Sequence, residues 1–186
     1  HNEDEISRKD IRINDTILVQ RAGDVIPQVL SVDKNKRSVK SKKFIFPTKC
    51  LCGHETKKET SLSTKKKDAV RRCIRGYECN FIAKEKLKHI VSKDAFDIEG
   101  LGKKVIDNFW ELNIIKTPAD IFNLDYTKIQ KLEGWGNLSI KNLRNAVTSS
   151  KNVFLDKFIF SIGIRHIGQE NAKILANFFK QSEKFS

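Results

Sequence analysis

The four cysteines of the chain have the residue type and spacing of a metal site. They are Cys50, Cys52, Cys73 and Cys79. Zinc prefers four soft ligands in tetrahedral geometry, which two pairs of thiolates supply. Two disulfides are the alternative, but no export signal is visible in the sequence, and this favours zinc. Bound zinc would also stabilise a segment that has few apolar residues for a core.

The first cysteine pair is tighter than the usual zinc knuckle. One residue, Leu51, separates Cys50 from Cys52, whereas two residues are usual. We expect this spacing to strain the turn that presents both thiolates to one ion. His54 is an alternative ligand in place of Cys50, although a surface histidine without a metal role is the simpler interpretation. A cluster that no longer binds metal is a further alternative.

Three short glycine turns recur in the second half of the chain. Their last glycines, Gly102, Gly136 and Gly168, lie 34 and 32 residues apart, and a helical pattern of apolar residues follows each one. A glycine at a helix start leaves free N–H groups at the positive end of the helix dipole, where a phosphate can approach closely. A single turn of this kind would be a connection between packed helices, but three copies favour phosphate binding. The turns are Glu99-Gly100-Leu101-Gly102-Lys103, Glu133-Gly134-Trp135-Gly136-Asn137 and Arg165-His166-Ile167-Gly168-Gln169.

The positive charge is concentrated in one stretch of the 186 residues. The net charge is +13, and residues 34–88 hold 18 Lys and Arg against 5 Asp and Glu, which accounts for all of it. A run such as Lys65-Lys66-Lys67 is typical of a solvated surface. A basic stretch that flanks a cysteine cluster and leads into phosphate-binding turns instead indicates a nucleic acid partner. No apolar run approaches membrane-spanning length, so an intracellular protein without a membrane partner is expected.

The first two turns are the expected main contacts with nucleic acid, because His166 replaces the first glycine of the third turn. We expect Gly102 and Gly136 to require a positive φ. Trp135 is expected to be a packing anchor rather than a wedge between bases. Lysines after the turns are candidate helpers, or else ordinary solvated residues, and Arg21 either contacts nucleic acid or forms a turn pair with Asp24. The candidate contacts are Gly100, Gly102, Lys103, Lys104, Gly134, Gly136, Lys141, Gly168 and Arg21, with Lys173 as a further helper.

The hydrophobic pattern divides the chain into three parts. Residues 1–46 contain short apolar runs at 16–20, 28–32 and 43–46, which predict antiparallel strands from the end of a small barrel. The cysteines all follow in residues 47–80, the expected zinc finger.

From residue 81 the apolar spacing becomes helical. Leu87, Ile90 and Val91 lie on one face of a predicted helix. Thr117 before Pro118 predicts the start of a second helix, and Asp125 is the expected cap of a third. The predicted fold class is therefore multidomain α+β, with a partial β-barrel, a small cysteine-rich finger and an all-α repeat domain over residues 81–186.

These motifs, in this order, resemble the NAD-dependent DNA ligases of bacteria. The resemblance covers the whole chain, and several ordered motifs are more specific than any one of them. The chain departs from the family in the short Cys50–Cys52 spacing and in a longer, Lys-rich insert before Cys73. The matching segments are residues 21–29 of an OB-fold domain, residues 46–50 at the entry of a four-cysteine zinc finger, and residues 87–92, 97–102, 117–122 and 161–168 of a helix-hairpin-helix domain.

The resemblance implies a parent enzyme that seals nicks in double-stranded DNA during replication and repair. In this family NAD adenylates a lysine, the adenylate moves to the 5′-phosphate, and the 3′-hydroxyl displaces AMP. Residues 1–46 would end the OB-fold domain, residues 47–80 would bind zinc, and residues 81–186 would carry three of four hairpins. The chain begins at His1 without Met, which indicates a fragment.

The resemblance places the chemistry outside this stretch. No segment matches the motif of the adenylated lysine, so we expect no catalytic residue here and no ligase activity from the chain alone. NAD and magnesium would be bound by earlier domains of the parent enzyme. The parent is expected to be a monomer in the bacterial cytoplasm, associated with the nucleoid.

Two other classes of protein share some of these features. One is a non-catalytic DNA-binding module built from a zinc finger and hairpins, against which the match at residues 21–29 argues. The other is a ribosomal or other RNA-binding protein, since basic zinc modules are common there. Competition between duplex RNA and nicked DNA would separate the second class from a ligase.

Overall fold

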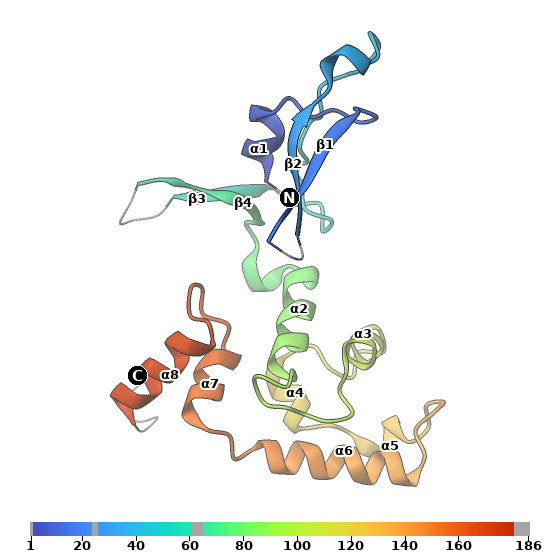
Figure 1. The fold of residues 1–186 in the computed structure, drawn as a ribbon. Helices are drawn as coiled ribbons and strands as arrows, with labels where there is room; N and C mark the ends of the chain where they lie inside the picture. The colour runs from blue at the N-terminus through green and yellow to red at the C-terminus, as the bar shows by residue number, and fades with distance from the viewer. Residues whose placement is uncertain (1, 24–25, 61–64, 181–186) are drawn as a thin grey trace. The chain divides into compact units, whose positions relative to one another are not determined.

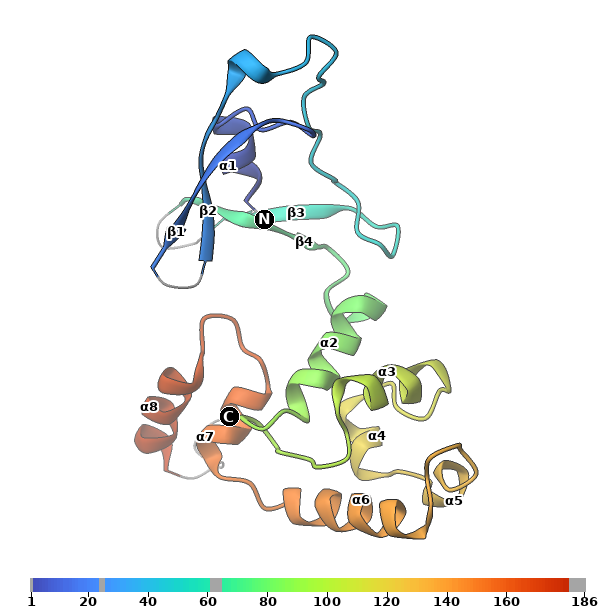
Figure 2. The ribbon, with the colours of Figure 1, turned by 45° about the vertical axis from the view of Figure 1, so that its right-hand side comes forward.

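The computed structural model describes residues 2–23, 26–60 and 65–180. Their contacts divide the chain into two compact units, His1–Gly76 and Tyr77–Ser186. Figures 1 and 2 show that the strands belong to the first unit and that the second is built from helices. The predicted combination of strands with helices is therefore confirmed.

The first unit contains two small antiparallel sheets (Figure 1). Its elements are α1 (Glu3–Arg8), β1 (Ile17–Ala22), β2 (Ile26–Val32), the 3-10 helix η1 (Lys34–Lys36), β3 (Thr56–Thr60) and β4 (Lys67–Cys73). β1 pairs with β2 in a register that places Ile17 opposite Val32. β3 pairs with β4, with Thr56 opposite Cys73. The contacts join residues 47–76 to this unit, and the separate boundary at residue 46 stays a prediction.

Two of the three strands expected in the first 46 residues form, as β1 and β2. The third expected strand, residues 43–46, is wrong, because these residues lie in no strand. Ile45 is 86% exposed. Phe44 packs edge-on against Phe46, with ring centroids 6.1 Å apart, so these side chains make local contacts rather than contacts with a partner strand. Gly23, which directly follows β1, has φ +64°.

The helix α1 and the hairpin β3–β4 are additions that the sequence pattern does not predict. The side chain of Asn2 accepts the N–H of Asp4 at 3.0 Å, which caps the start of α1. Glu3 then joins this helix to the hairpin through Arg71 at 2.8 Å and Lys58 at 3.0 Å. The hydrogen bonds from Arg71 and Lys58 lower the pKa of Glu3 to about 2.

Ion pairs hold the loops of the first unit together. The guanidinium of Arg37 contacts Asp10 at 2.6 Å and Asp15 at 2.8 Å. Arg12 adds a second contact to Asp10 and, with Arg37, lowers the pKa of that carboxyl to about 2. Among the described residues, every buried apolar side chain belongs to the second unit. Charge pairing, rather than a core, therefore fixes the loops around β1 and β2.

The second unit is a set of short helices around one apolar core. Its helices are α2 (Asn80–Ile90), α3 (Lys103–Glu111), α4 (Pro118–Phe122), α5 (Tyr126–Ile129), α6 (Asn137–Ser150), α7 (Leu155–Ser161) and α8 (Gln169–Phe179). Figure 2 shows α6 as the longest of them, leading into α7. Leu87, Ile106, Ile121 and Leu143 are buried at the centre. No described helix has the length and apolar character needed to cross a bilayer.

The predicted helix starts of the second unit are confirmed. Pro118 is the first residue of α4, and the Asp120 carboxylate accepts the N–H of Thr117 at 2.7 Å. Asp125 caps α5 by accepting the N–H of Thr127 at 3.1 Å. The expected helical face is also present, since Leu87 in α2 is 1% exposed.

Trp135 is the packing anchor that the sequence predicts. Its ring lies 5.4 Å from the ring of Phe109, and it packs against the buried core. Phe109 is fully buried in α3. The tip of the second turn is thus fastened to the helix that follows the first turn.

The burial of Phe109 against Trp135 predicts that the stability of the second unit depends on this ring. Phe109→Ala removes a fully buried ring, and should lower the free energy of unfolding by about 3–5 kcal/mol. Leu138→Ala is the matched control, because Leu138 is 70% exposed and its loss should cost little. Urea unfolding followed by tryptophan fluorescence measures both variants. Equal destabilisation by the two substitutions would contradict this description of the core.

Candidate metal centre and nucleic-acid interface

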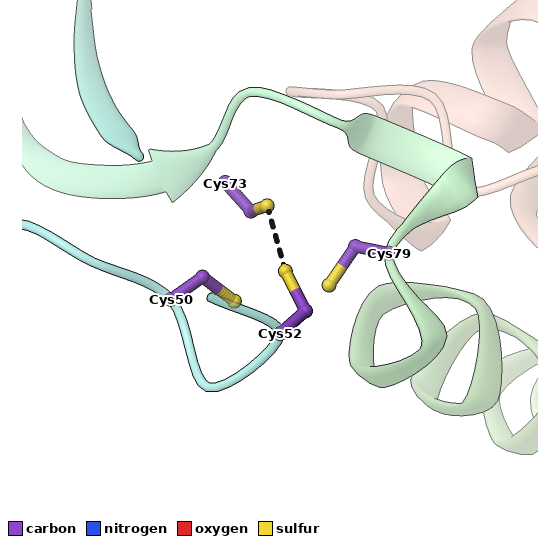
Figure 3. Close-up of side chains that lie close together, drawn as sticks. All are labelled: Cys50, Cys52, Cys73 and Cys79. Carbon is purple, nitrogen blue, oxygen red and sulfur yellow. Dashed lines mark hydrogen bonds between the residues drawn. The ribbon is translucent and has the colours of Figure 1, made fainter. Parts of the chain in front are cut away.

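The four cysteines converge on one point (Figure 3). Their sulfur atoms all lie within 4.8 Å of one another, and the sulfurs of Cys52 and Cys73 are 3.5 Å apart. Zinc–thiolate bonds of about 2.3 Å in tetrahedral geometry place the sulfurs roughly 3.8 Å apart. The cluster therefore fits the size and the ligand chemistry of a zinc ion.

A glycine turn accommodates the short spacing of the first cysteine pair. The N–H of Cys50 donates to the carbonyl of His54 at 2.7 Å, and the N–H of Gly53 donates to the carbonyl of Cys50 at 2.8 Å. Gly53 has φ +85°, a conformation that glycine adopts without steric cost. The strain expected at Cys50–Cys52 is thus avoided by the residue after the second cysteine.

The other two cysteines are placed by regular structure. Cys73 is the last residue of β4, and Cys79 follows the 3-10 helix η2 (Gly76–Glu78) at the cap position of α2. Cys79 is 1% exposed. His54 is exposed, with its Nδ1 atom 3.6 Å from the sulfur of Cys52, and it lies outside the group of four sulfurs. The geometry therefore provides four thiolates without the histidine.

The three glycine turns share one hydrogen-bonded geometry. Each contains a four-residue β-turn, at residues 98–101, 132–135 and 164–167, in which the N–H of the fourth residue donates to the carbonyl of the first at 3.1 to 3.2 Å. The third residue of each has a positive φ, as the third position of a type II turn requires. The hydrogen bonds are Leu101 to Ile98, Trp135 to Leu132 and Ile167 to Ile164, and the φ values are +90° for Gly100, +82° for Gly134 and +66° for His166.

The expectation that Gly102 and Gly136 require a positive φ is wrong. Their φ values are −64° and −81°, and Gly168 has −80°. The positive angle belongs two residues earlier, because the type II turn is completed before the helix begins. A side chain added at any of these three glycines would meet no atom within 4 Å. The space over each helix start is open.

His166 keeps the third turn in the geometry of the first two, and its expected weaker phosphate binding stays a prediction. It adopts the positive φ that glycine has in the other two turns, a region in which histidine occurs more often than most residues. The side-chain amide of Asn171 donates to the carbonyl of His166 at 2.9 Å and supports this conformation. Sequence analysis missed Asn171, although a polar side chain one turn into the following helix is a visible signal.

The helices after the turns begin without a side-chain cap. Gly102, Gly136 and Gly168 are the cap residues of α3, α6 and α8, and no side chain accepts a hydrogen bond there. The N–H groups of the first turn of a helix have no acceptor within the helix. In α1 and α5 the side chains of Asn2 and Asp125 fill that role. The three turn glycines have no side chain that could accept these N–H groups, so the groups are available to an acceptor from another molecule.

The candidate basic residues differ in what they contact. Lys103 and Lys104 in α3 and Lys141 in α6 are exposed, and none has a carboxylate partner among the described residues. Lys173 in α8 pairs with Glu170 at 2.9 Å, which weakens its case as a helper. Arg21 is exposed on β1, and the proposed pairing with Asp24 involves a residue outside the described part.

Comparison with known proteins connects these features to one family. Residues 1–41 match the family model of the NAD-dependent DNA ligase OB-fold domain. The DNA ligase of Pelagibacter ubique is 58% identical over 187 residues, which cover 100% of this chain and 28% of that protein. The DNA ligase of Xanthobacter autotrophicus is 50% identical over 94% of the chain and 25% of the relative.

A third relative gives the same result. The DNA ligase of Parvibaculum lavamentivorans is 47% identical over 100% of this chain and 27% of its own length. The chain thus spans about a quarter of the DNA ligases that it matches. The resemblance to bacterial NAD-dependent DNA ligases is confirmed: the chain is related along its whole length to DNA ligases, and its first 41 residues match the OB-fold domain of the NAD-dependent family.

Proposed function

We propose that this chain is the part of an NAD-dependent DNA ligase that grips nicked double-stranded DNA through its phosphates. The observation that carries the proposal is the repeated turn, which presents an uncapped helix start beneath open space three times. The relatives named DNA ligase support DNA as the polyanion that such a device would bind. The α2–α3, α5–α6 and α7–α8 pairs would then be the hairpins of a helix-hairpin-helix domain.

Backbone amides suit the task of a nick-sealing enzyme. A nick occurs in any sequence, so its recognition must not depend on base identity. N–H groups at the starts of α3, α6 and α8 bind phosphate oxygens, which carry no sequence information. Lys103, Lys104 and Lys141 would add charge near these sites, and binding would weaken as salt rises. The first two turns are the proposed main grip.

Zinc at the cysteine cluster would stabilise the segment that holds the four cysteines. Cys50, Cys52, Cys73 and Cys79 would hold the ion as thiolates. The first unit lacks buried apolar side chains in its described residues, so metal binding would supply free energy that packing does not. The ion has no proposed part in the sealing reaction.

The reaction itself is proposed for the whole ligase. There, NAD would adenylate a lysine outside this stretch, the adenylate would activate the 5′-phosphate, and the 3′-hydroxyl would displace AMP with magnesium present. The whole enzyme would act as a monomer in the bacterial cytoplasm, at the nucleoid, in replication and repair. The present chain would contribute binding and no catalytic residue.

The turn glycines test the proposed grip. Gly102→Val and Gly136→Val each place a side chain in the open space where a phosphate would lie, at backbone angles that valine adopts without strain. DNA affinity should fall by roughly 10- to 100-fold on every duplex sequence, as a hydrogen bond to a charged group is lost. The slope of log affinity against log salt should become shallower by about one unit per lost phosphate contact.

A matched control separates lost contact from lost fold. Thr117→Val alters the cap of α4, a helix start in the same unit without a glycine turn, and should leave DNA affinity unchanged. Circular dichroism confirms that each variant is folded, and titrations on two unrelated duplexes give the affinities. Folded Gly102 and Gly136 variants that bind as tightly as the parent chain would show that the turns serve packing alone.

Zinc content tests the metal proposal. The purified chain should hold about one zinc ion, and Cys73→Ser should lose it, because three thiolates bind zinc less tightly than four. His54→Ala is the control and should retain the ion, since the four sulfurs cluster without the histidine. Elemental analysis decides between the outcomes. A parent chain without zinc, even after metal is added, would mean that the cluster does not bind metal.

Reaction with NAD tests where the chemistry lies. The chain incubated with NAD labelled in its adenylate moiety should remain unlabelled, because no segment matches the adenylated-lysine motif. A full-length bacterial NAD-dependent ligase is the positive control. A stable adenylate on any lysine of the chain would contradict the proposal.

A further inference from the structure

A cavity of about 500 Å³ lies among α2, α4 and α7 of the second unit, apart from the glycine turns. Its wall is almost entirely apolar. Ser161 is one of its few polar residues, and its hydroxyl already donates to the carbonyl of Phe158 at 2.7 Å. The main apolar residues of the wall are Leu87, Ile90, Phe96, Pro118, Phe122 and Phe158.

Two lysines at this cavity form no ion pair within 4 Å among the described residues, although Lys116 is near enough to Glu111 to help lower the pKa of that carboxyl. The ammonium of Lys86 lies over the ring of Tyr77, 3.2 Å from its centroid, and that of Lys116 lies 4.3 Å from the ring centroid of Trp110. Partial burial lowers the pKa of Lys86. Each cation therefore rests on an aromatic face, where a nearby anion would stabilise it further.

Other lysines of α2 form ion pairs, in contrast to Lys86. Lys84 pairs with Glu111 at 2.8 Å, and Lys88 pairs with Asp107 at 2.9 Å, so both are neutralised by acids of α3. Lys86, between them in the sequence, faces the cavity instead. The cavity thus combines apolar walls with two ammonium groups that form no close ion pair among the described residues.

We propose that this cavity binds a compact amphipathic anion, with an apolar or aromatic body against the walls and one anionic head beside Lys86 and Lys116. Its volume is in the range of sites that enclose small ligands, and its apolar lining supplies binding free energy while a few charged groups fix the orientation. The same chemistry is available from a free amphipathic carboxylic acid or from an aromatic side chain next to a carboxylate in a peptide. The site uses none of the proposed phosphate contacts.

Two fluorescent probes that differ mainly in charge test the proposal on the 186-residue chain. 8-Anilinonaphthalene-1-sulfonate carries a sulfonate, and N-phenyl-1-naphthylamine has a similar ring system without it. The sulfonate probe should bind at least tenfold more tightly. The double variant Lys86→Gln/Lys116→Gln should lose that preference while it still binds the neutral probe, and Lys128→Gln should behave like the parent chain.

A second variant locates the probe. Ala119→Trp fills the cavity from an exposed position of α4, and should weaken both probes. Equal binding of the two probes by the parent chain, unchanged binding by the lysine variant, or displacement of the sulfonate probe by saturating duplex DNA would each overturn the proposal.

Competition identifies the source of the ligand. Decanoate represents a free amphipathic acid, and the blocked dipeptide acetyl-Asp-Phe-amide represents a peptide. Displacement of the sulfonate probe by one of them supports the proposal and assigns the source. Displacement by neither would contradict the proposed ligand class.

Discussion

The N–H groups in the first turn of a helix need an acceptor that the helix itself does not supply. A capping side chain is one way to meet this need, as α1 does with Asn2 and α5 with Asp125. The helices α3, α6 and α8 begin at glycines and do not. Their open starts connect the fold to the proposed function, because the groups that need an acceptor are those that bind phosphate.

Packing keeps these starts in place. The type II turn before each glycine is closed by one hydrogen bond, and in the first two turns the apolar residue at the fourth position packs in or against the core. Leu101 is 1% exposed, and Trp135 stacks near Phe109. A rigid turn with a buried tip presents its following amides in one orientation, so little ordering is needed when DNA binds.

Spacing and residue type were sufficient to locate the turns and the helices that follow them. The sequence could not show which glycine of a pair takes the positive φ, because either one tolerates it. His166 resolves this in the structure, since it occupies the strained position and leaves Gly168 as the cap. The cysteine cluster was predictable as a set, whereas the role of Gly53 depends on backbone angles that spacing does not reveal.

The first unit was harder to predict because its stability does not depend on a buried apolar face. Residues 43–46 look like a strand by composition but have no paired neighbour, while β3 and β4 are rich in Lys and Arg and give no apolar alternation. Charge pairs such as Arg37 with Asp10 and Asp15 depend on residues far apart in the chain. Hydrophobic periodicity carries no information about such contacts.

Backbone NMR during a DNA titration tests the central claim most directly, because it observes the amides themselves. The ¹⁵N–¹H signals of residues 102–104 and 136–138 should shift most, those of residues 168–170 less, and by the same pattern with two duplexes of unrelated sequence. Shifts confined to the basic residues of β3 and β4, with the signals of the helix starts unchanged, would contradict the account.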